Sequence, residues 1–225
     1  MKVEKVVNVF TAVVFDYNGV LINDLEFHEE AYLMAAKEMG FPLTREVARK
    51  YISATAIQKR KLYFGDISDD TWDRLFLLKT EYYFDLIEHR SPLFPEVKEV
   101  LYYLSRRYLL GLLSNTPRGY FEKVFPRDLA RLFQATTFGD EMRDPKPDPG
   151  PLLGMMRRLN VSPDQCCYVG DSISDVLMAK KAGIKIFSVT TGDSSKEELR
   201  EAGSDWVLHS LSELKKELGS VAPLS

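Results

Sequence analysis

The chain has 225 residues, of which 45% are hydrophobic and 28% are charged, so it can bury a sizeable core as one large domain or as a core with a smaller second unit. A formal net charge of -3 argues against general nucleic-acid binding. No uninterrupted apolar run approaches the roughly 18 residues of a membrane span, and the first residues lack the pattern of a signal peptide, so we expect a cytoplasmic protein that binds neither membranes nor nucleic acid.

An apolar segment near the N-terminus ends on a single carboxylate. Residues 10–15 are rich in β-branched and aromatic side chains and almost free of polar groups, which is typical of a central parallel strand covered on both faces. Asp16 follows at the strand end where ligands bind in open α/β sheets, and a carboxylate held there can serve as a nucleophile or a metal ligand. Gly19 allows a tight turn and close approach to an anion. Taken alone, the stretch fits an ordinary strand and turn equally well.

Helical periodicity dominates the next part of the chain, from Asp24 to Arg90. Apolar residues recur at helical spacing over residues 26–39, and Gly40 and Pro42 provide a C-terminal stop. Potential N-caps favour further helices over residues 44–51, 55–64 and 68–89. Since this part contains no convincing strand, the sequence predicts a helical cap domain over residues 24–91, inserted into a core domain formed by residues 1–23 and 92–225.

From residue 92 onward, helices alternate with short apolar strands. The predicted helices cover residues 96–105, 117–124, 149–159, 173–182, 195–202 and 211–218, and the predicted strands cover residues 108–113, 135–138, 166–169, 184–189 and 205–208. This alternation predicts an α/β fold with a Rossmann-like parallel sheet and helices on both faces. The two cysteines, Cys166 and Cys167, are neighbours in one strand and are interpreted as buried strand residues.

Polar groups follow two more of these segments. Ser114 and Asn115 stand at a strand-to-helix junction, where side chains and free backbone N–H groups can hold phosphate oxygens, although the same residues also make an ordinary helix cap. Lys146 lies between two prolines that restrict the local backbone. A lysine fixed in this way can neutralise a phosphate or a nucleophilic aspartate.

Two carboxylates follow the strand at residues 166–169. Asp171 and Asp175 are four residues apart and could join Asp16 around a hard cation. Mg²⁺ prefers oxygen ligands and keeps several waters. The sequence therefore predicts a Mg²⁺ site at the ends of the strands.

The four segments together resemble the haloacid dehalogenase-like hydrolases, specifically the helical-capped phosphatase and phosphomutase branch related to phosphoglycolate phosphatase. The resemblance covers essentially the whole chain. Its motifs are Asp16-Tyr-Asn18-Gly19, Ser114-Asn115, Lys146-Pro-Asp-Pro and Gly170-Asp171-Ser172-x-x-Asp175. Their order at four strand ends makes a chance match very improbable.

The resemblance implies hydrolysis of a small phosphate monoester from a phosphorylated metabolite. Asp16 would attack phosphorus and form an aspartyl-phosphate, which splits one difficult displacement into two. Ser114 and Lys146 would hold the phosphoryl oxygens, with Asn115 nearby. Substrate identity and oligomeric state stay open.

The resemblance also implies a phosphate cradle and a metal site. Backbone N–H groups around Asn18 and Gly19 would complete the cradle. Mg²⁺ would be bound by Asp16, the backbone carbonyl of Asn18 and Asp171, with Asp175 acting directly or through water. The metal would reduce the repulsion between an anionic nucleophile and an anionic substrate.

Asn18 is the departure from the family pattern. Most phosphatases of this family have a second aspartate there, which protonates the leaving group and later deprotonates the attacking water. An amide does neither, and losing a general acid–base typically costs about 10²- to 10⁴-fold in rate. The chain is then a slow phosphatase, an enzyme restricted to good leaving groups, a phosphoryl-ligand-binding or regulatory protein, or a protein in which the carboxyl was exchanged by engineering.

Two further branches of the family are weaker alternatives. Dehalogenases also lack the second aspartate, but they need no Mg²⁺ and usually lack a carboxylate where this chain has Asp171. Phosphonate hydrolases need a cap lysine that forms a Schiff base, and nothing in the sequence marks a desolvated one among Lys37, Lys50, Lys59 and Lys61.

Other charged and aromatic residues of the cap are interpreted as structural. The charged run Lys59, Arg60 and Lys61 is expected to face solvent. His28 and His89 have no partner at an informative spacing, and His209 is expected at the surface. The aromatic residues of the last cap helix are expected to pack in the cap: Trp72, Phe76, Tyr82, Tyr83 and Phe84.

Overall fold

The computed structural model describes residues 10–219, with the exceptions of residues 53, 89 and 91. The chain divides into two compact units. The core unit is formed by Met1–Ile22 and Leu93–Ser225, and the helical unit is formed by Asn23–Pro92. Within the core unit, Ile22 makes isolated bridges to Asn18 and to Leu93, where the chain leaves this unit and returns to it.

The helical unit contains four described helices. They are α1 (Leu25–Glu38), α2 (Arg45–Lys50), α3 (Ala56–Phe64) and α4 (Asp69–Ile87). Thr44, Thr55 and Ser68 cap the last three of these, because each side chain accepts a hydrogen bond from a backbone N–H of the first turn. The last helix predicted for the helical unit extends to residue 89, which lies outside the described residues.

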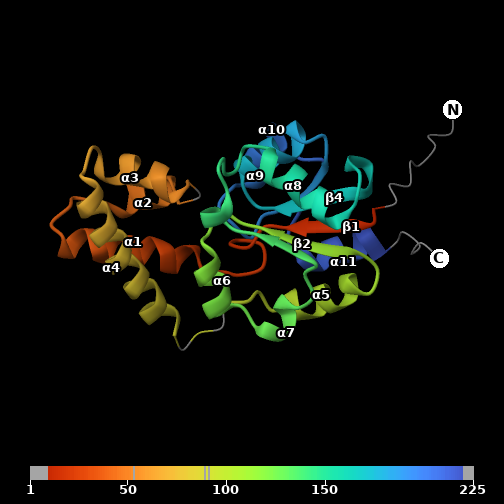
Figure 1. Cartoon of the computed structure of the whole chain (residues 1–225), viewed down its shortest axis with the longest axis horizontal. Helices are drawn as coiled ribbons and strands as arrows, with labels where there is room; N and C mark the ends of the chain where they lie inside the picture. The colour runs from red at the N-terminus through yellow and green to blue at the C-terminus, as the bar shows by residue number, and fades with distance from the viewer. Residues whose placement is uncertain (1–9, 53, 89, 91, 220–225) are drawn as a thin grey trace. The chain divides into compact units, whose positions relative to one another are not determined.

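An aromatic cluster forms the core of the helical unit. Helices α1 and α4 pack side by side (Figure 1), and Tyr32 and Tyr63 meet edge to face with ring centroids 5.2 Å apart. Leu75 is buried in the same cluster, and Trp72 and Tyr82 pack at its edge. The prediction that the aromatic residues of α4 pack in this unit is confirmed for these two.

The core unit is built on a parallel sheet. Among the described residues, six strands form it in the order β3-β2-β1-β4-β5-β6. They are β1 (Ala12–Phe15), β2 (Leu109–Leu113), β3 (Ala135–Thr137), β4 (Cys166–Gly170), β5 (Lys185–Val189) and β6 (Trp206–Leu208). Every pair is parallel, so the predicted fold class is confirmed.

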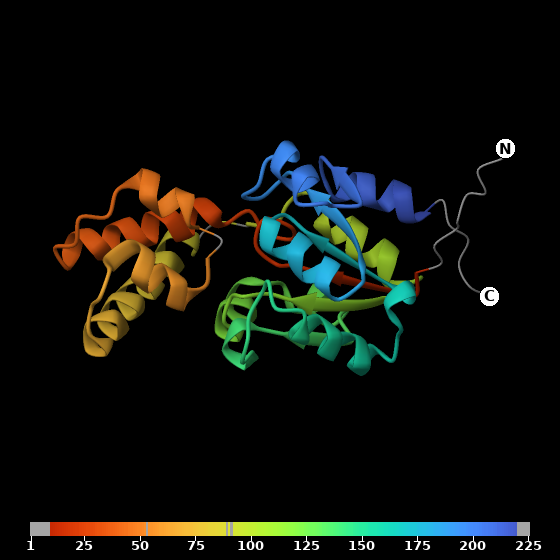
Figure 2. The same cartoon turned by 90° about the horizontal axis from the view of Figure 1, so that it is seen from above.

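Helices cover both faces of this sheet (Figure 2). They are α5 (Val97–Ser105), α6 (Arg118–Val124), α7 (Arg127–Ala130), α8 (Gly150–Leu159), α9 (Ile173–Lys181), α10 (Lys196–Glu201) and α11 (Leu211–Gly219). Residues of α5, α6, α7 and α11 share one hydrophobic cluster, and residues of α8, α9 and α10 share the other. The short helix α7 was not predicted.

The central strand β1 is buried on both faces, as its composition predicted. Val13 and Phe15 point into one cluster and Ala12 and Val14 into the other, because successive side chains of a strand alternate. The alternation continues on β4, where the two unpaired cysteines are buried and face opposite clusters. Asp16 therefore follows a strand that is buried on both faces and paired with a neighbouring strand along both edges.

Candidate active site

The ends of three neighbouring strands meet at one edge of the sheet. Phe15 of β1 lies opposite Leu112 of β2 and opposite Val169 of β4. Since carboxyl ends of parallel strands share an edge, the residues that follow them are brought together. Asp16 and Asp171 follow β1 and β4 in this way.

The Asp16 carboxylate is held by two partners. Its Oδ2 lies 2.7 Å from the Nζ of Lys146, and its Oδ1 accepts a 2.7 Å hydrogen bond from the backbone N–H of Tyr17. Asp16 is only 7% exposed. Burial raises the pKa of Asp16 to about 7, although the positive charge of Lys146 opposes the increase.

Lys146 bridges two carboxylates. Its Nζ lies 2.8 Å from Oδ1 of Asp175 and 3.4 Å from the hydroxyl of Tyr168. Burial disfavours the ammonium, but the charges of Asp16 and Asp175 outweigh burial and raise the pKa of Lys146. Its backbone N–H donates to Oδ1 of Asn115 at 3.1 Å, which fixes the lysine loop against the end of β2.

Asp175 uses both carboxylate oxygens. Its Oδ1 accepts hydrogen bonds from Lys146 and, at 3.1 Å, from Tyr168, while its Oδ2 accepts from the Ser172 hydroxyl at 2.6 Å and from the backbone N–H of Asp171 at 3.2 Å. Burial raises the pKa of this group, but Lys146 and the hydrogen bonds outweigh burial and lower it. Asp175 is therefore an ionised anchor for Lys146 and for the loop after β4.

Asp171 has less compensation for its charge. Its Oδ2 accepts a 3.0 Å hydrogen bond from the backbone N–H of Asp193. Burial, together with the charges of Asp175 and Asp16, raises its pKa well above the ordinary value. A buried carboxylate that resists ionisation when alone is stabilised by a cation.

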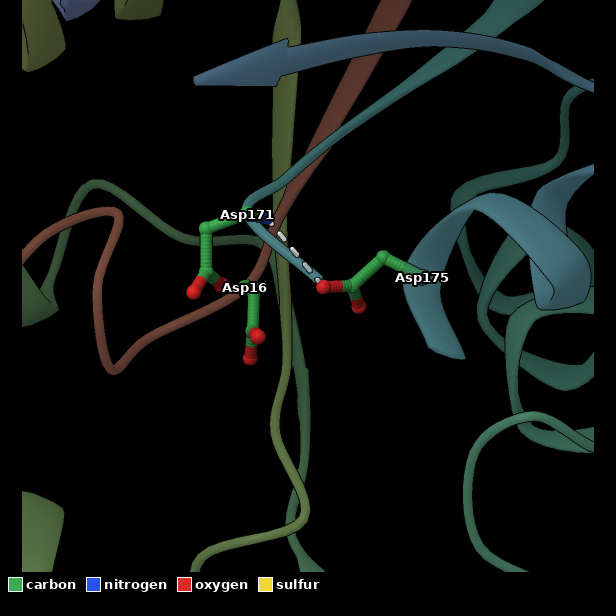
Figure 3. Close-up of side chains that lie close together, drawn as sticks. All are labelled: Asp16, Asp171 and Asp175. Atoms are coloured by element: carbon green, nitrogen blue, oxygen red, sulfur yellow. Dashed lines mark hydrogen bonds between the residues drawn. The ribbon is translucent and has the colours of Figure 1, made fainter. Parts of the chain in front are cut away.

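The three aspartates fit a hard metal ion. Of the described residues, Asp16, Asp171 and Asp175 form a buried group whose potential ligand atoms all lie within 4.8 Å of one another. Figure 3 shows the carboxylates of Asp16 and Asp171 side by side and that of Asp175 entering from α9. Oxygen donors of this kind suit Mg²⁺.

Asn18 is engaged through its carbonyl oxygen. The hydroxyl of Thr116 donates to Oδ1 of Asn18 at 2.6 Å, and the hydroxyl of Ser114 lies 3.5 Å from the same atom. The backbone N–H of Thr116 in turn donates to the Ser114 hydroxyl at 3.1 Å. The structure thus brings Asn18 and Ser114 together as predicted, and it adds Thr116, which sequence reasoning missed.

Gly19 makes the predicted tight turn. Its φ is +73°, and its backbone N–H donates to the carbonyl of Ile22 at 2.8 Å. A Cβ at this position would lie 2.5 Å from Oδ2 of Asp171. Any side chain at Gly19 would therefore push on a candidate metal ligand.

The helical unit holds a second buried polar cluster, which the sequence did not predict. Nζ of Lys79 lies 2.8 Å from Nδ1 of His28, Nε2 of His28 lies 3.2 Å from Oδ2 of Asp24, and the hydroxyl of Tyr83 donates to Asp24 at 2.7 Å. The interpretation that His28 has no partner at an informative spacing is wrong, because Asp24 lies four residues before it. Burial, followed by the charge of Lys79, lowers the pKa of His28 to about 4, and burial with the charge of Lys59 lowers the pKa of Lys79.

Other charged residues singled out in the sequence lie outside the group of buried aspartates. The prediction that the charged run of α3 faces solvent is confirmed for Lys61 and wrong for Lys59 and Arg60, which are half-buried. Lys59 lies over the Tyr32 ring, and Arg60 pairs with Asp69 at 2.6 Å within the helical unit. His209 is exposed, as predicted, and its backbone N–H donates to Glu213. His89 lies outside the described residues. No helix within residues 10–219, as far as they are described, combines the length and apolar character needed to cross a bilayer.

Comparison with known proteins identifies the class to which this fold and site belong. The family model for haloacid dehalogenase-like hydrolases matches residues 13–189. The chain therefore belongs to the haloacid dehalogenase-like hydrolases, as the sequence motifs predicted.

Relatives with assigned activities are similar over most of the chain. The phosphorylated carbohydrates phosphatase of Thermotoga maritima is 32% identical over 201 residues, which cover 86% of this chain and 91% of that protein. The phosphoglycolate phosphatase of Vibrio parahaemolyticus is 28% identical over 212 residues, which cover 90% of this chain and 93% of that protein. The predicted enzyme class, a hydrolase of this family related to its phosphatases, is confirmed.

A solved structure shares the fold. The crystal structure of CbbY from Rhodobacter sphaeroides in complex with phosphate superimposes on this chain with a TM-score of 0.78 and 24% sequence identity. The superposition covers 91% of this chain and 96% of the CbbY chain. At this level of identity the likeness concerns the fold.

Proposed function

We propose that the protein is a cytoplasmic, Mg²⁺-dependent phosphatase that hydrolyses a small phosphate monoester through an aspartyl-phosphate on Asp16. One observation carries the proposal. The Asp16 carboxylate lies 2.7 Å from a buried lysine and shares a group of buried carboxylates whose ligand atoms lie within 4.8 Å of one another. The names of the relatives, phosphatases of phosphorylated carbohydrates and of phosphoglycolate, support a small phosphorylated metabolite as substrate.

The metal would be held by Asp16, Asp171 and the backbone carbonyl of Asn18, with Asp175 acting directly or through water. When bound, Mg²⁺ supplies positive charge that lowers the repulsion between the nucleophile and the phosphoryl group. The raised pKa of Asp171 supports this assignment, because burial and neighbouring carboxylates leave its negative charge without a sufficient counter-charge. Asp175 already anchors Lys146 and the loop after β4, which favours a contact through water for this residue.

The chain's own groups would carry out the displacement. An Asp16 oxygen forms a bond to phosphorus as the bond between phosphorus and the leaving oxygen breaks. Lys146 and the Ser114 hydroxyl stabilise the phosphoryl oxygens, and the backbone N–H groups near Asn18 and Gly19 add further donors. Asn115 positions Lys146 through its 3.1 Å hydrogen bond to the lysine's backbone N–H.

Asn18 would limit both steps of the reaction. Its carbonyl oxygen is taken by the Thr116 hydroxyl, and an amide does not give a proton to a leaving group or take one from water. The carboxylate of an acyl phosphate and the phenolate of an aryl phosphate can leave without protonation, so these substrates would phosphorylate Asp16. Water would then attack the aspartyl-phosphate slowly.

Burst kinetics test this proposal. Mixing the full chain and Mg²⁺ with an activated aryl phosphate should release about one equivalent of product per chain quickly and then continue slowly, and Asp16→Asn should abolish the burst. Phosphate attached to a peptide containing Asp16 should be detectable by mass spectrometry. Absence of both burst and labelled peptide while Mg²⁺ is bound would leave the competing assignment, a phosphoryl-ligand-binding or regulatory protein without turnover.

One observation favours a second candidate, a phosphonate hydrolase. Such enzymes need a lysine that forms a Schiff base, and Lys79 is 3% exposed and has a lowered pKa. Its amine would attack the carbonyl carbon of an aldehyde substrate and form an imine with loss of water. Borohydride treatment with a small phosphonoaldehyde should then leave a reduced adduct on Lys79 and none in Lys79→Met. Labelling confined to exposed lysines would rule this candidate out.

A further inference from the structure

The loop after β5, residues 190–194, packs against Asp171. The backbone N–H of Asp193 donates to Oδ2 of Asp171 at 3.0 Å, and the backbone N–H of Ser194 donates to the Asp171 backbone carbonyl at 3.3 Å. At its other end the loop is tied to β6, because the backbone N–H of Thr190 donates to the carbonyl of Leu208 at 3.0 Å. The loop thus fixes both the main chain and the carboxylate of Asp171.

Gly192 fits this loop against Asp171 because it lacks a side chain. A Cβ at position 192 would lie 1.8 Å from Oδ2 and 2.3 Å from Cγ of Asp171. Its Cα would also be 2.9 Å from a Cβ at Gly19. Any larger residue at position 192 must displace the carboxylate or the loop.

Thr191 connects the same loop to the turn after β1. Its hydroxyl donates to the backbone carbonyl of Gly19 at 2.7 Å. This turn also carries the Asn18 carbonyl, which the proposed function assigns to the metal. One short loop therefore holds two of the assigned ligand groups, which come from different strands.

We propose that the 190–194 loop positions the metal ligands, with Gly192 and the Asp193 N–H setting the Asp171 carboxylate and Thr191 setting the Asn18–Gly19 turn. Thr191 and Gly192 are positioning residues, since they act through Asp171 and Gly19. The inference rests on the proposed function, because it assumes that Asp171 and Asn18 bind Mg²⁺. Supporting groups of this kind typically change metal affinity by about 10- to 100-fold.

The test measures Mg²⁺ affinity without substrate, by calorimetry and by the rise in melting temperature of the full chain. Gly192→Ala should weaken Mg²⁺ binding by about 10- to 100-fold. Gly119→Ala is the matched control, since a Cβ at Gly119 in α6 would meet nothing within 4 Å, and it should bind Mg²⁺ like the unchanged protein.

A second pair of variants keeps the test valid if Gly192→Ala does not fold. Thr191→Val removes the hydroxyl at constant size and should weaken Mg²⁺ binding by about tenfold, whereas Thr191→Ser keeps the hydroxyl and should restore it. Unchanged Mg²⁺ affinity in both Gly192→Ala and Thr191→Val, or in Thr191→Val alone where Gly192→Ala is unfolded, would overturn the positioning role. Failure of the unchanged protein to bind Mg²⁺ would overturn the proposed metal site itself, which is a distinct result.

Discussion

Exchange of Asn18 for aspartate tests the chemistry of the site most directly. The side chain keeps its size, and a carboxylate oxygen can accept the 2.6 Å hydrogen bond that Thr116 now donates to the amide carbonyl. We therefore expect Asn18→Asp to hold the same orientation.

The expected gain follows from general acid–base catalysis. A positioned group that transfers a proton contributes about 10²- to 10⁴-fold, which is about 3 to 5 kcal/mol of the barrier. Alkyl phosphates should gain the full factor, because their leaving group needs a proton. Aryl phosphates should gain mainly in the second step, so that their burst disappears and steady turnover rises.

Steady-state and rapid-mixing assays on one alkyl and one aryl phosphate separate these effects. Asn18→Asp combined with Asp16→Asn is the control, because it keeps the new carboxyl and removes the nucleophile, and it should be inactive. Adding Thr116→Val to Asn18→Asp should reduce the gain if the hydroxyl orients the carboxyl. If Asn18→Asp turned over each substrate at the same rate as the unchanged protein does, the reasoning would be refuted.

Three further outcomes are expected. Mg²⁺ should raise the melting temperature of the unchanged protein, because a ligand of the folded state stabilises it, and Asp171→Ala should lose this shift. Mg²⁺ affinity measured by calorimetry should fall as the pH is lowered through about 7, because protons on Asp16 and on Asp171, whose pKa values are both raised, compete with the metal. His28 has a pKa lowered to about 4 and stays neutral in the folded state, whereas the same group in the unfolded chain takes up a proton below about pH 6.5. The free energy of unfolding should therefore fall by up to about 3 kcal/mol between pH 6.5 and 4. His28→Gln should show a smaller fall when the free energy of unfolding is measured by urea titration.

Three residues of the site were predictable because each follows a recognisable strand. Asp16, Ser114 and Asp171 come directly after apolar segments, and the carboxyl ends of parallel strands share one edge whatever the order of the strands. The sequence therefore indicated which residues gather. It did not indicate their hydrogen bonds, which depend on neighbours in space.

The supporting residues escaped prediction for this reason. Tyr168 reads as an apolar strand residue, but its hydroxyl reaches Asp175 and the carbonyl of Leu113 at 3.1 and 3.2 Å. Gly192 matters only because β5 lies beside β4, which places the loop after β5 against Asp171. No local pattern of residue types carries that information.

Lys79 is different, because the sequence does contain a pattern that indicates its burial. It lies four residues after Leu75 and four before Tyr83, and all three are on the buried face of α4. A lysine within an apolar stripe at helical spacing is a candidate for burial.

The division of the chain also sets an order of folding. The helical unit is one continuous stretch, Asn23–Pro92, whereas β1 pairs with β2 and β4, and β4 begins only at Cys166. During synthesis β1 must stay without this second sheet partner while the helices behind it have already emerged, and closing such distant pairings is slow. Ribosome-bound chains that stop before β2, which begins at Leu109, should therefore contain protease-resistant helices α1–α4 together with a β1 that is still open to cleavage and to chaperones.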